Sequence, residues 1–284
     1  MSIFKCRDYK LVLSNKTHIM GILNVTPDSF SDGGKFFKPE IAVKHALDMV
    51  KDGADIIDIG GESTRPYSLP ITPEEEIRRI LPVLKKLVKK VKIPISVDTY
   101  KYEVAKVALE EGASIINDIS GLHFDKRIAE LVSKYKAGII IMHIKGTPKD
   151  MQENPVYKDV IKEVKSYIKE GIKIAISAGI SRNSIMIDPG IGFGKTLEHN
   201  LIIFKRLNEL KKLGFPILIG PSRKSFIGKI LNLPVNERLE GTLAAVAVSI
   251  LNGASVVRVH DVKEVYRATK IIDAIMKFST LKTS

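Results

Sequence analysis

Short apolar segments that end on a polar residue recur eight times along the chain, and this repetition limits the fold more than any other feature. The clearest case, Ile185 to Asp188, predicts a buried strand that ends on an acid. A glycine-rich turn follows, and a helical pattern begins near Leu197. Acids at the carboxyl ends of strands build the sites of many α/β proteins. A nucleotide P-loop is excluded, because Pro189 stands where that motif needs glycine.

The eight predicted strands alternate with helical segments. The strands are expected at about 17–23, 55–59, 95–97, 114–116, 138–142, 185–188, 216–219 and 255–259. Helices are expected at about 39–51, from 74, at about 101–111 with Gly112 as C-cap, at about 156–177 and after 261. No linker divides the chain, so we predict one (β/α)8 TIM-barrel domain over residues 1–284, with a hairpin at 3–13 closing its floor. A doubly wound sheet is the alternative, but no G-x-G-x-x-G follows the first strand.

Composition narrows the class of protein. The length of 284 residues suits one barrel of about 250 residues. The single cysteine, Cys6, excludes an internal disulfide and favours the cytoplasm. No apolar run approaches the roughly 20 residues that span a bilayer, so no membrane partner is expected. The net charge of +13 is spread over many helices without interleaved aromatic residues, which argues against a nucleic-acid partner.

Three strand ends carry groups suited to a flat heterocycle. Asp98, Asn117 and Asp188 end the third, fourth and sixth strands, and in a barrel they would converge on one pocket. Carboxylates accept hydrogen bonds while an amide both donates and accepts, so the set suits an amino-pyrimidine edge. Lys224 adds a donor for a ring carbonyl. Each acid alone could equally be a satisfied strand-end group.

A second set of residues is suited to an anion, most simply phosphate. It consists of Arg65, Arg258 and His260, with Asn24 and Thr64 in nearby loops. The oxygen of Asn24 could also help to place Mg²⁺ between two phosphates, because magnesium needs few protein ligands. The alternative for Arg258 is a surface ion pair with Asp261.

Seven segments, in order from about residue 19 to residue 261, resemble the dihydropteroate synthase family. They are Asn24-Val-Thr-Pro-Asp-Ser-Phe-Ser-Asp-Gly-Gly, Asp58-Ile-Gly-Gly-Glu-Ser-Thr-Arg-Pro, Ser96-Val-Asp-Thr, Ile116-Asn-Asp-Ile-Ser-Gly, Ile187-Asp-Pro-Gly-Ile-Gly-Phe-Gly-Lys, Ser222-Arg-Lys-Ser and Arg258-Val-His-Asp. The resemblance implies that 4-aminobenzoate displaces pyrophosphate from (7,8-dihydropterin-6-yl)methyl diphosphate, with Mg²⁺, in folate biosynthesis. It also implies a homodimer and a target of sulfonamides.

The resemblance assigns roles residue by residue. The pterin would be bound by Asp98, Asn117, Ile119, Met142, Asp188, Lys224 and Arg258. Pyrophosphate would be bound by Asn24, Thr64, Arg65, Arg258 and His260, with Asn24 also at the metal. The aminobenzoate side would be formed by Phe30, Thr64, Arg65, Pro66, Phe193, Lys224 and Ser225. The catalytic residues would be Asp98, Asp188, Lys224 and Arg258.

Two other functions are weighed against this one. A folate-binding methyltransferase of the same barrel superfamily also binds a pterin, but it has no use for Arg258, His260 or Ser222-Arg-Lys-Ser. An inactive relative with a scaffolding role would have lost at least one key residue, yet Asn24, Asp98, Lys224 and Arg258 are all present.

Overall fold

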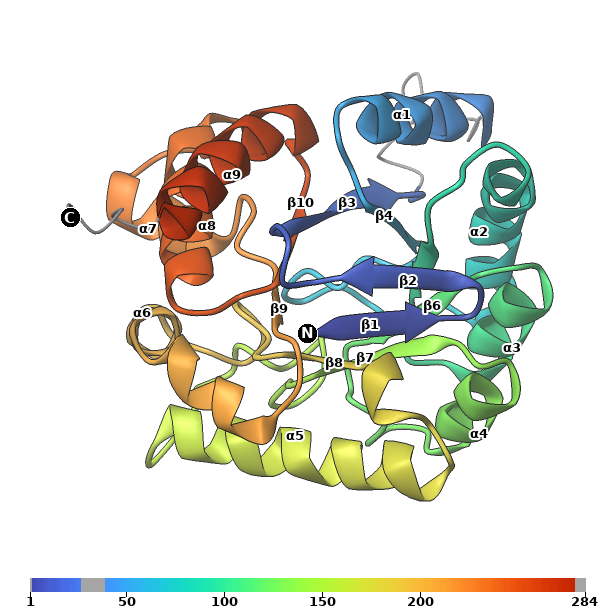
Figure 1. Ribbon diagram of the computed structural model, residues 1–284. Helices are drawn as coiled ribbons and strands as arrows, with labels where there is room; N and C mark the ends of the chain where they lie inside the picture. Colours follow the sequence, from blue (N-terminus) through green and yellow to red (C-terminus); the bar gives the residue numbers. More distant parts are fainter. Residues whose placement is uncertain (1, 27–38, 279–284) are drawn as a thin grey trace, which may run out of the picture.

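Eight parallel strands form a ring in the computed structural model, which describes residues 2–26 and 39–278 (Figure 1). In ring order they are β8 (Ile185–Asp188), β7 (Gly138–Met142), β6 (Ile115–Asp118), β5 (Ile95–Asp98), β4 (Ile56–Gly60), β3 (His18–Asn24), β10 (Val256–Val259) and β9 (Leu218–Ile219). A parallel bridge between Ile187 and Ile217 closes the ring. The predicted (β/α)8 barrel is confirmed.

Helices surround the ring (Figure 1). They are α1 (Pro39–Lys51), α2 (Pro73–Val88), α3 (Tyr102–Glu110), α4 (Arg127–Lys134), α5 (Val160–Ser177), α6 (Leu197–Lys205), α7 (Ser225–Leu231), α8 (Leu239–Leu251) and α9 (Val262–Lys277). Short 3₁₀ helices span Arg182–Ser184, Leu207–Leu213 and Val235–Glu237. Most of the residues that the helices bury form one large apolar core together with the outer face of the sheet.

A few elements differ from the sequence prediction. Helix α5 begins at Val160 instead of 156, because the Asp159 side chain accepts from the backbone N–H groups of Ile161 and Lys162 and caps the helix there. The C-cap of α3 is Glu111, and Gly112 follows it with a φ of 105°. Helices α4, α7 and α8 are not among the helices whose positions are expected from the sequence.

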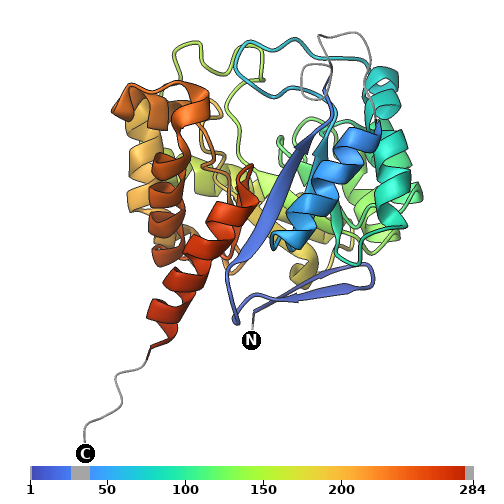
Figure 2. The same cartoon turned by 90° about the horizontal axis from the view of Figure 1, so that it is seen from above.

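The N-terminal hairpin closes the floor of the barrel, as predicted. Strands β1 (Ile3–Cys6) and β2 (Tyr9–Val12) pair antiparallel and lie across the end of the ring opposite the longer loops (Figures 1 and 2). Phe4 is fully buried there in an apolar cluster. The buried members of this cluster are Phe4, Cys6, Leu13, Met20, Ile56, Ile115, Ile140, Met186, Leu218 and Val256.

A polar layer lies directly above this apolar floor. Because side chains alternate along a strand, the residue two positions after an inward-facing one also faces inward. The residues two positions after Ile56, Ile115, Met186 and Val256 are Asp58, Asn117, Asp188 and Arg258. On these four strands the barrel interior therefore changes from apolar to polar towards the carboxyl ends, where barrel enzymes have their active sites.

Candidate active site

Arg258 is the centre of a buried network inside the barrel. Its Nε donates to Asp58 Oδ2 at 2.6 Å, and a terminal nitrogen donates to Asp98 Oδ2 at 2.8 Å. The amide of Asn117 donates to the same Asp58 oxygen at 3.1 Å. Asp58 is fully buried, and the network of Asp58, Asp98, Asn117 and Arg258 joins residues from four strands. A surface pair of Arg258 with Asp261 is wrong, because the Asp261 carboxylate accepts from Arg223 instead.

Asp98 and Asn117 face each other across adjacent strands, as their register on β5 and β6 shows. Within the described residues, Asp98 Oδ1 and Asn117 Oδ1 are buried and accept no hydrogen bond. Burial raises the pKa of Asp98 to about 7, although the positive charge of Arg258 acts in the opposite direction. Because buried polar atoms in folded proteins are nearly always hydrogen bonded, two neighbouring unused acceptors indicate a ligand that carries donors.

Asp188 and Lys224 lie beside these acceptors. Asp188 accepts from the backbone N–H of Gly190 at 2.7 Å, and burial raises the pKa of its carboxyl to about 6. Burial and then the charge of Arg258 lower the pKa of Lys224 to about 8. The Lys224 ammonium lies 4.2 Å from the centre of the Phe193 ring. At neutral pH Asp98 is therefore about half ionised, Asp188 is mostly ionised and Lys224 is still mostly protonated.

An apolar wall adjoins the polar groups. Ile119, Met142 and Phe193 pack in one cluster, which also contains Ile144 and Met151. Met142 is also the register neighbour of Asp188. The structure therefore brings together three of the five apolar residues assigned to substrate binding from the sequence, next to one of the acids. An aromatic ring and a thioether suit the face of a flat heterocycle.

His260 lies near Arg258, but it is not the cation expected from the sequence. Its Nδ1 is 2.9 Å from Ser222 Oγ. Burial and then the charge of Arg258 lower the pKa of His260 to about 3. His260 is therefore neutral at pH 7 in this state and offers a hydrogen bond instead of a charge. Ser222, which orients the ring, had no role predicted from the sequence.

The remaining predicted residues lie around the mouth. Among the described residues, no hydrogen bond or ion pair joins the side chains of Thr64 or Arg65 to Arg258 or His260. Pro66 and Ser225 are exposed. Phe30 lies outside the described residues. Figure 2 places the loop over residues 61–72 on the side of the barrel opposite the hairpin.

A buried lysine, Lys195, stabilises the glycine-rich turn that follows β8. Lys195 Nζ lies 2.9 Å from His143 Nδ1 and donates to the Phe193 carbonyl at 2.8 Å. Burial lowers the pKa of both Lys195 and His143 well below their ordinary values. The role of His143, which the sequence leaves undecided, is thus to hold the turn that presents Phe193.

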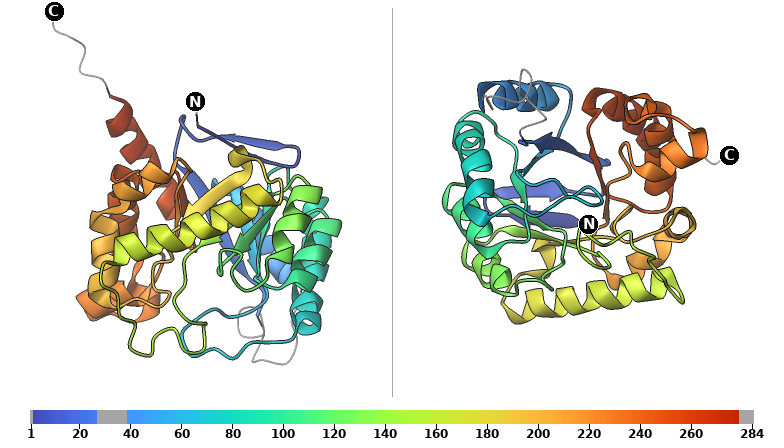
Figure 3. Two further views of the ribbon diagram at one scale, coloured as in Figure 1. Left: turned by 90° about the horizontal axis from the view of Figure 1, so that it is seen from below. Right: turned by 180° about the vertical axis from the view of Figure 1, so that it is seen from behind.

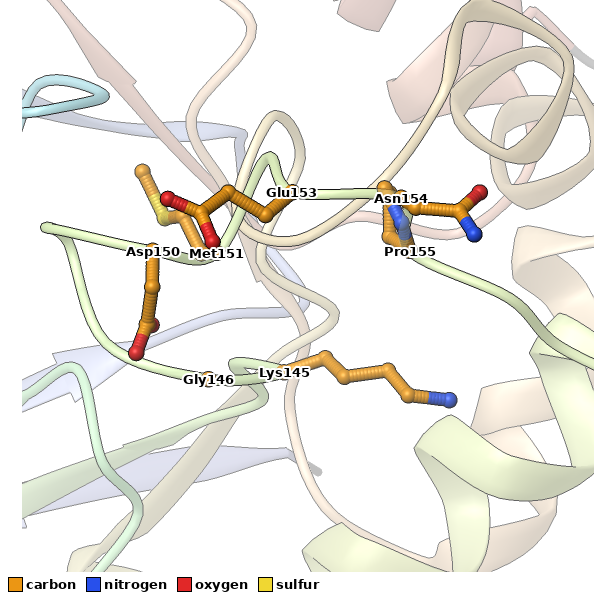
Figure 4. Close-up of a pocket in the computed structure, with 7 residues that line it drawn as sticks. All are labelled: Lys145, Gly146, Asp150, Met151, Glu153, Asn154 and Pro155. Carbon is orange, nitrogen blue, oxygen red and sulfur yellow. The ribbon is translucent and has the colours of Figure 1, made fainter.

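A pocket of about 280 Å³ opens elsewhere, in the loop after β7 (Figure 4). Two of its polar side chains are engaged within the loop: the Lys145 ammonium contacts the Val156 carbonyl, and Asp150 Oδ1 accepts from the Thr147 N–H at 2.6 Å. None of the strand-end residues lines it. The candidate active site is therefore the polar mouth of the barrel, which Figure 3 shows end-on from behind.

A comparison with protein families decides the assignment. The family described as pterin binding enzyme matches residues 20–260. The chain belongs to the pterin-binding enzyme family. Among its relatives, the dihydropteroate synthase of Clostridium beijerinckii is 49% identical over 266 residues, which cover 93% of this chain and 96% of that protein. The function of this chain is that of a dihydropteroate synthase, a transferase of a pterinylmethyl group in folate biosynthesis.

Solved structures agree with this assignment. The dihydropteroate synthase of Yersinia pestis, in complex with a sulfonamide drug, superposes with a TM-score of 0.92 at 40% identity and covers 97% of this chain and 100% of its own. That of Clostridium difficile, determined in the presence of pteroic acid, gives a TM-score of 0.88 at 48% identity with the same coverage. The barrel and the segments that carry the site residues are thus shared with enzymes of this function.

Proposed function

We propose that the polar mouth of the barrel binds the pterin of (7,8-dihydropterin-6-yl)methyl diphosphate. The observation that carries the proposal is the pair of buried, unused acceptors on Asp98 and Asn117. A pterin offers an exocyclic amine and ring N–H groups as donors, while Asp188 supplies a further acceptor. Lys224 would donate to the ring carbonyl, and Ile119 and Met142 would pack on the ring.

The same groups can support loss of pyrophosphate. Departure of the leaving group places positive charge on the exocyclic carbon, and the dihydropterin ring delocalises it. Asp188, and Asp98 in its ionised form, would stabilise that charge, while Arg258 would stabilise the leaving group and cover one ring face. Pyrophosphate would be held by Arg258 and His260 together with Asn24, Thr64 and Arg65.

The residues present fit a magnesium ion that is held mainly through substrate phosphates. No group of three His, Cys, Asp or Glu side chains within the described residues could hold a metal without substrate. Asn24 pairs in register with Gly60, and Gly60 with Asp98; a Cβ on Gly60 would lie 3.7 Å from Asn24 Oδ1. One amide oxygen at the mouth, with phosphates and water, matches what Mg²⁺ accepts. When bound, the metal would neutralise charge on the pyrophosphate.

The second substrate, 4-aminobenzoate, would bind on the outer side of the mouth. Its residues would be Phe30, Thr64, Arg65, Pro66, Phe193, Lys224 and Ser225. The arylamine is a neutral nucleophile, so its attack on the cationic carbon needs no strong general base. The same position would accept a sulfonamide, because such a compound also carries an aniline, with a sulfonamide group in place of the para carboxylate of 4-aminobenzoate.

A pyrophosphate-release assay tests this proposal. With the dihydropterin diphosphate and Mg²⁺, purified protein is expected to release pyrophosphate and form dihydropteroate only when 4-aminobenzoate is added. Chelation of the metal should abolish turnover and Mg²⁺ should restore it. Methyl transfer from a methylated folate, with no pyrophosphate release, would instead support the folate-binding methyltransferase.

Replacing Asp188 with asparagine should weaken pterin binding by about 1.5–3 kcal/mol, because a charge-assisted hydrogen bond becomes a neutral one. Isothermal calorimetry with a pterin that lacks phosphate measures the change. Glu209→Gln is a matched control, because within the described residues the ion pair of this carboxylate is with Arg206, near the surface. Unchanged affinity in Asp188→Asn would remove Asp188 from the pterin site.

We further propose a cytoplasmic homodimer. Exposed apolar side chains gather on α6, α7, α8 and the turn between α7 and α8; they are Leu201, Ile202, Ile230, Leu231, Val235, Val248 and Leu251. Such a surface suits a second copy of the chain, and sedimentation velocity would detect the dimer. In the described part of the chain, no helix has the length and apolar character needed to cross a membrane. The single free cysteine, Cys6, fits a reducing compartment.

A further inference from the structure

A buried ion pair joins the two ends of the loop that carries Thr64 and Arg65, and these joined ends form the neck of the loop. Glu62 stands at the start of the loop and Ile71 near its end. The backbone N–H of Ile71 donates to Glu62 Oε2 at 3.0 Å, and Lys101 Nζ donates to the Ile71 carbonyl at 2.8 Å. Lys101 also contacts Glu62 Oε2 directly. Both polar groups of the Ile71 backbone are therefore held by one Glu–Lys pair.

The groups of this neck are buried, which makes the arrangement specific. The side chains of Glu62, Glu76 and Lys101 are 5%, 1% and 11% exposed. Glu76 Oε2 is 2.6 Å from Lys101 Nζ, so the three N–H groups of the ammonium meet two carboxylates and one carbonyl. A buried charge that loses its partner is strongly destabilised. If the ammonium left this position, the two buried carboxylates of Glu62 and Glu76 would lose the positive charge that balances them.

The neck is tied to the strand end that carries the pterin acid. Lys101 and Tyr100 follow Asp98 by three and two residues. The Tyr100 hydroxyl donates to Glu62 Oε1 at 2.7 Å. The backbone N–H of Thr99 donates to the Asn117 carbonyl at 3.1 Å, which fixes this segment to β6. The segment 98–101 therefore joins the polar mouth of the barrel to the base of the loop.

The tip of the loop is closed by its own contacts. Ser68 Oγ donates to the carbonyls of Ser63, at 2.5 Å, and Arg65, at 2.7 Å. The N–H of Tyr67 donates to the Pro148 carbonyl at 3.0 Å, so the tip rests on the loop after β7. Figure 2 shows these two loops side by side above the barrel. Because these contacts fix the tip internally, its position in the described structure is set by the neck of the loop and by the contact with Pro148.

We propose that Glu62 and Lys101, with Tyr100, are positioning residues for the second substrate. By fixing the neck, they hold Thr64 and Arg65 at the distance from Asp98 that 4-aminobenzoate requires. The assignment of Thr64 and Arg65 to that substrate rests on the proposed function. The pterin groups depend much less on the neck, because Asp98 and Asn117 are held by β5, β6 and Arg258. Loss of the Glu62–Lys101 pair should therefore weaken the binding of the two substrates unequally.

The test is Lys101→Met, which keeps an unbranched side chain of nearly the same length and removes its charge. The KM for 4-aminobenzoate is expected to rise at least tenfold, while the affinity for a phosphate-free pterin, measured by calorimetry, stays within threefold. Lys85→Met is the matched control, because Lys85 pairs with Glu111 at 3.0 Å on the surface, where the two side chains are 51% and 36% exposed. Lys101→Arg should recover most of the lost affinity.

A second variant covers the case in which Lys101→Met fails to fold. Tyr100→Phe removes only the hydroxyl that contacts Glu62, and it should raise the same KM two- to fivefold. In either folded variant, the amide of Ile71 should exchange with deuterium at least tenfold faster than in the wild type. Equal losses for both substrates, or an unchanged KM with faster exchange, would overturn the positioning role. An inactive wild-type protein would instead refute the proposed function.

Discussion

Arg258→Ala is expected to lower turnover at least a hundredfold, which corresponds to about 2.7 kcal/mol in the barrier. The guanidinium pairs with two acids of the barrel interior, Asp58 and Asp98, at 2.6 Å and 2.8 Å. It would stabilise the pyrophosphate as the C–O bond breaks, when negative charge on the leaving group increases. An interaction that strengthens in the transition state acts on the rate and not merely on binding.

The measurement is steady-state pyrophosphate release, combined with calorimetry for pyrophosphate and for a phosphate-free pterin. Pyrophosphate affinity should fall much more than pterin affinity, which loses stacking and part of the support for Asp98. Arg206→Ala is the matched control: Arg206 also pairs with two carboxylates, those of Asp159 and Glu209, but on the surface. That variant should keep normal turnover. If Arg258→Ala did so as well, the anion site would have to lie elsewhere.

The polar mouth could be predicted from the sequence because it follows from local rules. A strand that ends on a polar residue, at the edge where barrels place their sites, identifies Asp98, Asn117 and Asp188 without any knowledge of packing. The alternation of side chains along a strand also predicts that Asp58 faces inward, because it lies two residues after the inward-facing Ile56. A search of strand ends alone misses this residue, since Asp58 lies two residues before the end of β4.

The partners of these residues could not be predicted. Arg258 and Asp58 are 200 positions apart, and only the closure of the ring brings them together. From the sequence, Asp261 is an equally reasonable partner for Arg258, but a turn after β9 presents Arg223 to it instead. The same limit applies to the Glu62–Lys101 pair, which joins loops of different strands. The charge state of His260 depends on its burial beside Arg258, and neither the burial nor the proximity can be read from the sequence.

Gly190→Ala is expected to destabilise the protein more than an ordinary glycine replacement, by at least about 3 kcal/mol. Gly190 has a φ of 69°, and a Cβ built there would lie 1.9 Å from the His143 carbonyl oxygen. The left-handed conformation alone costs alanine about 1–2 kcal/mol. The clash adds to this cost, because the carbonyl belongs to a buried strand end that cannot withdraw.

Gly214→Ala separates the two contributions. Gly214 has a similar φ of 77°, but the nearest atom to a Cβ there is a side-chain nitrogen of Arg182 at 3.5 Å. This variant should therefore show the conformational cost without the clash when both are unfolded in urea. In Gly190→Ala the turn must also move away from His143, and the N–H that it donates to Asp188 moves with it. Turnover should then fall in Gly190→Ala alone. Equal stability losses in the two variants would mean that the turn relaxes freely, and that its close approach to β7 does not hold Asp188 in place.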